Sequence, residues 1–172
     1  METKIEGGYV RDETFAKEYF SFHAYRQPLG IVLTEICVLA IISGLINVIV
    51  LQQYWGVINI ALGISLFVLR GVRVKKNVRI SLERDKESNR GHIVSVQNFV
   101  TENAIVVKSS LNEAGTEYEM SRIEKVYRSK HYIYLLTKAQ VVIAFDVDQF
   151  SKGTPEELIE LMRQKGIKVK VK

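Results

Sequence analysis

Few residues in this 172-residue chain have the type and spacing that metal binding or nucleophilic catalysis requires. The histidines His23, His92 and His131 lie far apart, and Cys37 is the only cysteine. The sequence has no cysteine pair, HExxH, GxSxG or glycine-rich phosphate loop. His23 lies among aromatic residues, which favours a packing or hydrogen-bonding role. We expect no metal site, no cofactor and no enzymatic activity.

One pair of acidic residues is spaced for acid–base chemistry. Asp146 and Asp148 flank Val147 directly after an expected strand, so both carboxylates could point to one face. A surface turn that carries two acids is the commoner arrangement, and an active site here is the minor alternative.

The elements that would position any site begin with an apolar stretch of 41 residues, 29–69, which contains one formal charge. It divides into runs of 23 residues (29–51) and 19 residues (54–72). As helices these runs would measure about 34 Å and about 28 Å, enough to cross a bilayer. We therefore predict a two-helix transmembrane hairpin over 29–72, and the alternative is a helical hairpin buried in a soluble core.

Basic residues gather directly after the second run, whereas the turn between the runs has no Lys or Arg. The positive-inside rule then predicts a multi-pass protein of the cell membrane with both termini cytoplasmic. The segment 73–90 is interpreted as a basic juxtamembrane linker that contacts anionic lipid head groups. The residues expected to do so are Arg73, Lys75, Lys76 and Arg79.

The charge distribution argues against a nucleic-acid partner. The formal net charge is 24 − 19 = +5. Most of the excess belongs to the juxtamembrane cluster, and residues 91–172 hold 12 basic and 10 acidic residues, a net charge of +2. A nucleic-acid reader needs a basic surface on its folded domain.

A hairpin that folds about the middle of its turn pairs residues whose numbers sum to 105, which places Glu35 level with Arg70. We expect these two side chains to form an intramembrane ion pair, because an unpaired carboxylate in the bilayer is costly. Gly56 and Gly63 share a helix face with Arg70 and would let the helices approach closely.

A competing seam uses the other face of the first helix. Ala40 and Gly44 are small and equal in depth to Ser65 and Ala61 of the second helix. Because two straight helices cannot pack through both faces, the Ala40 and Gly44 face is free and could serve self-association, which makes a homo-oligomer possible. The alternative is that these small residues are simply typical of a membrane helix.

The segment 1–28 is interpreted as an N-terminal amphipathic segment. Asp12 precedes Phe15, Tyr19 and Phe22, which share one face of a helix, and Asp12 suits the N-cap. Such a helix would lie in the membrane interface or pack against the cytoplasmic domain.

Between the second run and the following region, 72–82 fits either a strand or a helix, and continuity with the preceding run favours a helix. The highly charged segment 83–90 ends at Gly91 and is interpreted as linker.

The region 91–172 has short runs rich in β-branched and aromatic residues. Thr154, Pro155 and Glu157 then form a capping box that begins a final helix. This order predicts a small β-rich barrel or sandwich closed by one helix. The predicted strands are 92–100, 104–109, 116–120, 123–128, 132–137 and 141–145, with a short edge strand over 167–172.

The arrangement of two spans followed by a β-rich domain resembles the bacterial YcxB-like family. The resemblance rests on Phe99–Ile105 (FVTENAI), Tyr118–Val126 (YEMSRIEKV), Tyr132–Leu135 (YIYL) and the stretch 9–23. It implies a pleckstrin-homology-like fold for 91–172. The family implies architecture and location rather than an activity.

Two functional classes remain open. The first is a membrane-anchored binding or scaffold protein whose β domain docks an unknown protein partner beside the membrane. The second is anionic-lipid sensing, with membrane lipids as partners, or protection of the envelope against membrane-active peptides. The protection role follows only from resemblance to other membrane proteins with related domains.

Overall fold

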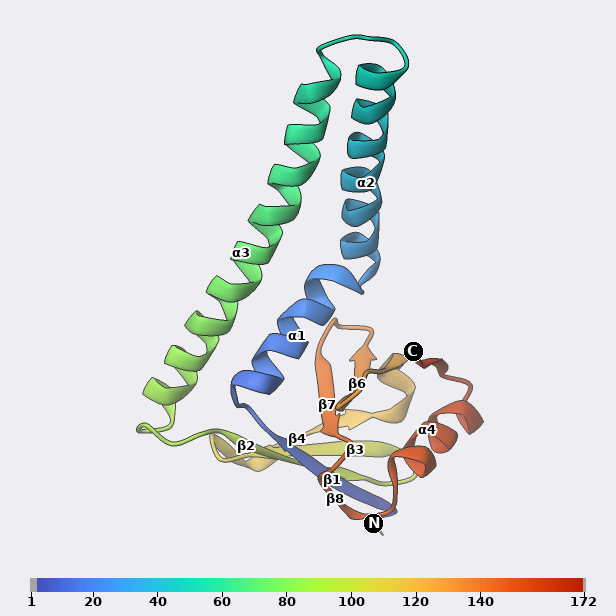
Figure 1. Ribbon diagram of the computed structural model, residues 1–172. Coiled ribbons are helices and arrows are strands. Elements are labelled where there is room, and N and C mark those ends of the chain that lie inside the picture. The colour runs from blue at the N-terminus through green and yellow to red at the C-terminus, as the bar shows by residue number, and fades with distance from the viewer. Residues whose placement is uncertain (1–2, 172) are drawn as a thin grey trace. The chain divides into compact units, whose positions relative to one another are not determined.

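The computed structural model describes residues 3–171, which form a helical unit and a β unit (Figure 1). The helical unit consists of residues 12–85. The β unit combines residues 86–171 with the N-terminal residues up to Arg11, which precede the helices in the sequence.

The helical unit begins at Asp12, whose carboxylate caps the first helix by accepting a hydrogen bond from Phe15 N at 2.8 Å. This confirms the predicted N-cap. Pro28 opens the second helix at its first turn, where a missing N–H costs nothing. The three helices are α1 (Glu13–Tyr25), α2 (Pro28–Ile49) and α3 (Gly56–Ser88).

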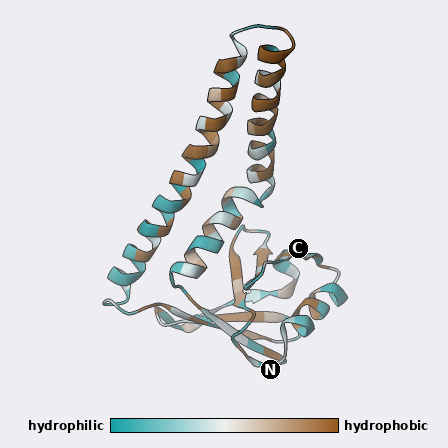
Figure 2. Cartoon of the chain, in the orientation of Figure 1, coloured by the Kyte–Doolittle hydropathy of each residue, from teal (hydrophilic) through white to brown (hydrophobic). Residues whose placement is uncertain are grey.

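Helices α2 and α3 are long and apolar enough to cross a membrane. In their most apolar windows only 17% and 6% of the residues are buried. Exposed apolar surface of this extent suggests that the two helices associate with a membrane. Figure 2 shows that α2 and the first half of α3 are hydrophobic, whereas the last turns of α3 are hydrophilic.

The segment after the second apolar run is helix rather than linker. Helix α3 continues without a break to Ser88. The segment 72–82, which fitted either a strand or a helix, is therefore helical, as continuity with the preceding run predicted. The interpretation of 83–90 as a linker is wrong for residues up to Ser88. The i,i+4 ion pair of Arg79 with Glu83, at 3.2 Å, contributes to helix stability in this charged stretch.

The β unit contains two sheets, in which all but one neighbouring pair of strands are antiparallel. The five-stranded sheet has the order β4-β3-β2-β1-β8 and the four-stranded sheet the order β7-β6-β5-β9, with β9 parallel to β5. The strands are β1 (Ile5–Val10), β2 (Ser95–Val100), β3 (Ala104–Ser109), β4 (Asn112–Glu119), β5 (Ile123–Arg128), β6 (Tyr132–Thr137), β7 (Val142–Asp146), β8 (Phe150–Lys152) and β9 (Lys168–Val171).

Helix α4 (Pro155–Gln164) follows the last antiparallel strand and packs into the core of the β unit. Thr154 and Glu157 form the predicted capping box through hydrogen bonds of 3.0 and 3.2 Å. Leu158 and Met162 are fully buried. The other core residues come from both sheets and include Ile105, Val126, Ile133, Leu135 and Phe145. A helical hairpin and a β domain with a terminal helix are thus confirmed.

Strand β1 was missed by the sequence analysis, which assigned it to the amphipathic segment 1–28. It lies inside the five-stranded sheet, between β2 and β8. A Cβ at Gly8 would lie 2.5 Å from Val96 O, so this close approach of backbones requires glycine. Gly8 N also donates a hydrogen bond to Gln149 O at 2.9 Å. The glycines that weaken the strand signal are therefore what lets β1 fit.

Candidate functional site

Three groups of residues could serve a function: the seam of the helical hairpin, the basic end of α3 and a polar hollow in the β unit. The seam is formed where backbones of α2 and α3 touch. A Cβ at Gly44 would lie 2.6 Å from Gly56 O, and a Cβ at Gly63 would lie 2.9 Å from Cys37 O. Glycines at these positions permit the close approach on which helix packing in a bilayer depends.

The register of this hairpin differs from the predicted one, because the turn is not symmetric. Gln53 N donates to Asn47 O at 2.9 Å, so Gln53 already lies level with Asn47. The numbers of facing residues therefore sum to 47 + 53 = 100, as they do for Gly44 and Gly56, rather than to 105. A shift of five residues rotates the facing stripe by about 140°.

Arg70 has different partners from the one predicted. Its guanidinium donates to Thr34 Oγ1 and to Gly30 O, both at 2.9 Å, and to Ala24 O. The guanidinium carbon also lies 4.8 Å from the centre of the Tyr25 ring, a cation–π contact. The segment in which α1 ends and α2 begins (residues 24–34) thus binds the Arg70 guanidinium through uncharged groups only.

The predicted ion pair of Glu35 with Arg70 is replaced by these contacts. Glu35 lies on the exposed side of α2. In the observed register, where the numbers of facing residues sum to 100, Gly30 rather than Glu35 lies level with Arg70. This shift is the physical reason why the predicted ion pair does not form. Since Arg70 bonds to backbone oxygens, its position depends on the fold of this segment rather than on a second charge.

The alternative seam predicted from Ala40 and Gly44 also differs from the structure. Gly44 packs against Gly56 and Ile60 of the same chain, so it is not available for contacts with a second copy. Of the predicted self-association face only Ala40, which is half-buried, lies outside this seam. Ala61 and Ser65, the expected partners of that seam, are exposed. A homo-oligomer stays a prediction.

The basic residues at the end of α3 are exposed, as contacts with lipid head groups require. Arg73, Lys75, Lys76 and Arg79 fall within an arc of about 160° on the helix. Arg79 is paired with Glu83, whereas Arg73, Lys75 and Lys76 take part in no ion pair within residues 3–171. Their contact with lipid stays a prediction.

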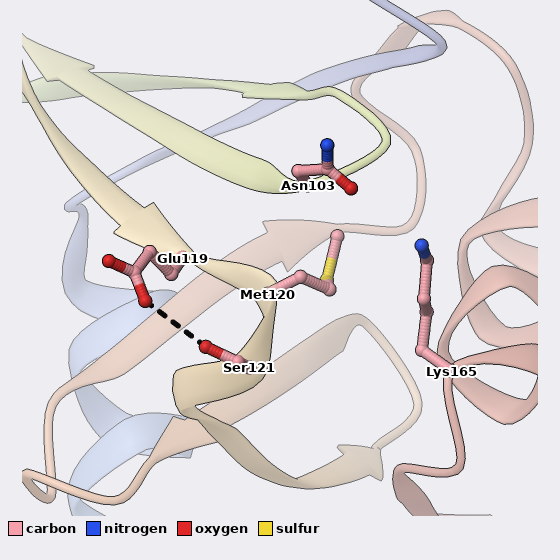
Figure 3. A pocket seen from close by; sticks show the side chains of 5 residues that line it. All are labelled: Asn103, Glu119, Met120, Ser121 and Lys165. Carbon is pink, nitrogen blue, oxygen red and sulfur yellow. Dashed lines mark hydrogen bonds between the residues drawn. The ribbon is translucent and has the colours of Figure 1, made fainter.

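A polar hollow of about 500 Å³ opens on the β unit (Figure 3). Its lining comes from three segments: the turn after β2, the end of β4 with the short 3₁₀ helix Met120–Arg122, and the end of α4. Glu119 Oε2 accepts a hydrogen bond from Ser121 Oγ at 3.1 Å and lies 3.8 Å from Arg122 Nε. The lining residues are Asn103, Glu119, Met120, Ser121 and Lys165.

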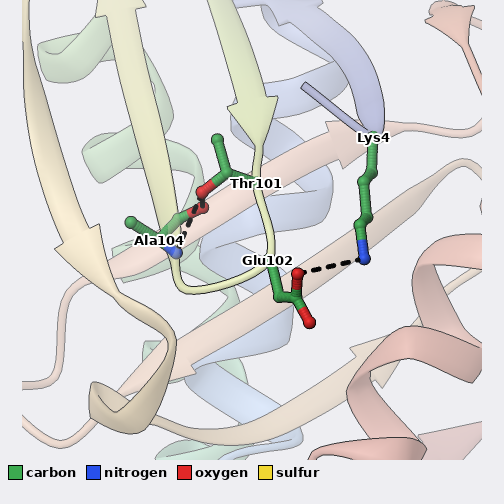
Figure 4. A network of polar contacts seen from close by, with 4 residues as sticks. All are labelled: Lys4, Thr101, Glu102 and Ala104. Carbon is green, nitrogen blue, oxygen red and sulfur yellow. Dashed lines mark hydrogen bonds and ion pairs between the residues drawn. The ribbon is translucent and has the colours of Figure 1, made fainter. Parts of the chain in front are cut away.

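Hydrogen bonds and one ion pair connect the residues next to Asn103 to each other and to Lys4 (Figure 4). Thr101 Oγ1 donates to Ala104 O at 3.0 Å and accepts from Ala104 N at 3.1 Å. Lys4 Nζ lies 3.5 Å from Glu102 Oε2, and Met120 N donates to Asn103 O at 2.8 Å. These contacts fix the turn that forms one side of the hollow.

The Asp146 side chain stabilises a turn and does not pair with the Asp148 carboxylate. The Asp146 carboxylate accepts hydrogen bonds from Asp148 N at 3.0 Å and from Gln149 Nε2 at 3.1 Å. The Asp148 side chain is exposed. This is an Asx-type turn, the arrangement judged commoner from the sequence.

His23 packs among aromatic rings. Its ring centre lies 4.6 Å from that of Tyr19 and 5.9 Å from that of Phe22. Its Nε2 is buried, and burial lowers the pKa of His23. No group of three or more His, Cys, Asp or Glu side chains that could hold a metal ion occurs among the described residues.

We expect the helical unit to lose stability in acid because of His23. Burial lowers the folded pKa of His23 below the unfolded value of about 6.5, so the helical unit is fully stable above that pH. Stability is lost as the pH falls from the unfolded value through the lower, folded pKa, because the unfolded chain takes up the proton first. Denaturation of the full chain in detergent at several pH values measures this effect. His23→Phe, which cannot titrate, should flatten the dependence below pH 6.5, and an unchanged profile would contradict the assignment.

Comparison with family models, with curated proteins and with solved structures finds no match to this chain.

Proposed function

We propose that this chain is a membrane-anchored, non-enzymatic binding protein whose β domain docks a protein segment at the cytoplasmic face of the cell membrane. One observation carries the proposal: a hairpin with exposed apolar helices is joined to a β domain that has its own core and an open polar hollow. Anchoring raises the effective concentration of a binding domain towards partners in the same membrane.

The cytoplasmic orientation is supported by the charges at the two ends of the hairpin. The turn between α2 and α3 has no Lys or Arg and carries the exposed rings of Tyr54 and Trp55, residues typical of a membrane interface. The other end of α3 carries the exposed basic cluster. Both termini then lie on the cytoplasmic side.

The pleckstrin-homology-like assignment of the β domain is supported by its two packed sheets and by α4, which follows the last antiparallel strand. The residues that resemble the YcxB-like family lie largely in this domain and include the turn at Asn103 and the segment around Met120, both next to the hollow.

The docking surface we propose combines the hollow with the neighbouring edge strand β4. This strand is an outer strand of its sheet, and an exposed edge can pair with an extended peptide. Glu113 and Glu117 are exposed on it, and Glu119 joins it to the hollow. These acids favour a partner segment with basic side chains.

A photo-reactive amino acid placed singly in the full-length chain tests this surface in native membranes. Probes at Ser121, in the hollow, and at Glu117, on β4, should give the same partner adduct. A probe at Lys130, in the β5–β6 turn, should not, because β5 separates it from Ser121 by about 18 Å. Equal adducts from all three positions, or none from any, would contradict the proposal.

A further inference from the structure

A groove between α2 and α3 combines apolar walls with basic side chains at one end. Its volume is about 370 Å³, within the range of small-ligand sites. The apolar part of the lining is Leu33, Ile36, Cys37, Leu66, Leu69 and Val72. The basic part is Arg70, Arg73 and Lys76.

The basic side chains of this groove carry uncompensated charge. Arg70 is held by neutral oxygens and an aromatic ring. Neither it nor Arg73 nor Lys76 belongs to an ion pair in the described part of the chain. Three unpaired positive charges beside one groove favour an anionic occupant.

The depth of the groove matches the boundary between hydrocarbon and head groups. Lys76 lies 20 residues after the start of α3 at Gly56, which is about 30 Å along the helix, close to the thickness of the hydrocarbon core. Leu66 and Leu69 therefore lie within the hydrocarbon, whereas Arg73 and Lys76 reach the head-group level.

We infer that this groove binds one anionic phospholipid. An acyl chain lies against the apolar walls, and the phosphate accepts hydrogen bonds from Arg73 and Lys76. Lys75, the neighbour of Lys76 at nearly the same depth, is exposed but does not line the groove. The site lies in the helical unit and does not depend on partner docking by the β domain.

Native mass spectrometry of the full-length chain released from nanodiscs tests the inference. The nanodiscs contain phosphatidylcholine with 20% phosphatidylglycerol, or phosphatidylcholine alone. We expect one retained phosphatidylglycerol per chain and no retained phosphatidylcholine. Lys76→Gln should reduce retention about fivefold, the effect of one basic residue near the surface, whereas Lys75→Gln should change it by less than about twofold.

A third variant separates the groove from general attraction of charge. Leu66→Trp fills the apolar part without changing any charge and should also reduce retention. Equal losses for Lys75→Gln and Lys76→Gln would show diffuse attraction only and would overturn the inference. Retention of phosphatidylcholine to the same extent, or a dimer without lipid, would overturn it as well.

Discussion

Gly44→Leu is expected to force the two membrane helices apart and to lower the free energy of unfolding of the full chain by about 1–3 kcal/mol, the usual cost of overpacking. A Cβ at this position would lie 2.6 Å from Gly56 O and 2.9 Å from Ile60 N. These are backbone atoms, which cannot rotate away as a flexible side chain can. Titration with SDS in mixed micelles, followed by the fluorescence of Trp55, the only tryptophan, measures the change.

Ala61→Leu is the matched control for this substitution. Ala61 is exposed on α3, so a larger apolar side chain there should meet lipid and change the free energy of unfolding by less than about 0.5 kcal/mol. If Ala61→Leu is the disruptive variant and Gly44→Leu is neutral, the register of the hairpin is wrong.

Phe145→Ala is expected to cost the β unit about 3–5 kcal/mol, because it removes a large side chain from the core. Phe145 is fully buried on β7 and stacks on Phe150 at a ring-centre distance of 5.8 Å. A loss of this size is a large part of the stability of a typical domain. Pulse proteolysis of the full chain in urea, with fragments from the β unit followed on gels, measures it.

Leu111→Ala provides the comparison for Phe145. Leu111 lies in the β3–β4 turn and is 46% exposed, so its truncation should change stability by less than about 0.5 kcal/mol. Comparable losses for the two variants would show that Phe145 does not lie in a closed core.

Features set by local sequence could be predicted well. The capping box of Thr154 and Glu157 and the N-cap at Asp12 are found where the sequence places them. Each depends on residues within one helical turn. The apolar helices follow from composition alone.

Features set by contacts between distant segments could not be predicted. The predicted pairing of Glu35 with Arg70 was wrong because the turn is not symmetric and the helices pack through Gly44 and Gly56, which shifts the register of the hairpin. Strand β1 was missed because Gly8 weakens the local β signal, although the sheet requires it.

The hollow of the β unit could not be predicted from the sequence either. Asn103, Met120 and Lys165 come from three separate segments, and none belongs to a local motif. Only the folded β unit brings them together.

Labelling of single cysteines by a membrane-impermeant thiol reagent tests most directly whether the hairpin crosses the bilayer. In a Cys37→Ser background, Gln53→Cys lies in the exposed turn between α2 and α3, and Ser110→Cys lies in the exposed β3–β4 turn. Gln53→Cys should react in intact cells, and Ser110→Cys only after the membrane is permeabilised. If both variants stay unreactive until the cells are opened, or if the chain stays in solution without detergent, a membrane-spanning hairpin is contradicted. A Ser110→Cys that reacts in intact cells while Gln53→Cys does not would reverse the proposed orientation.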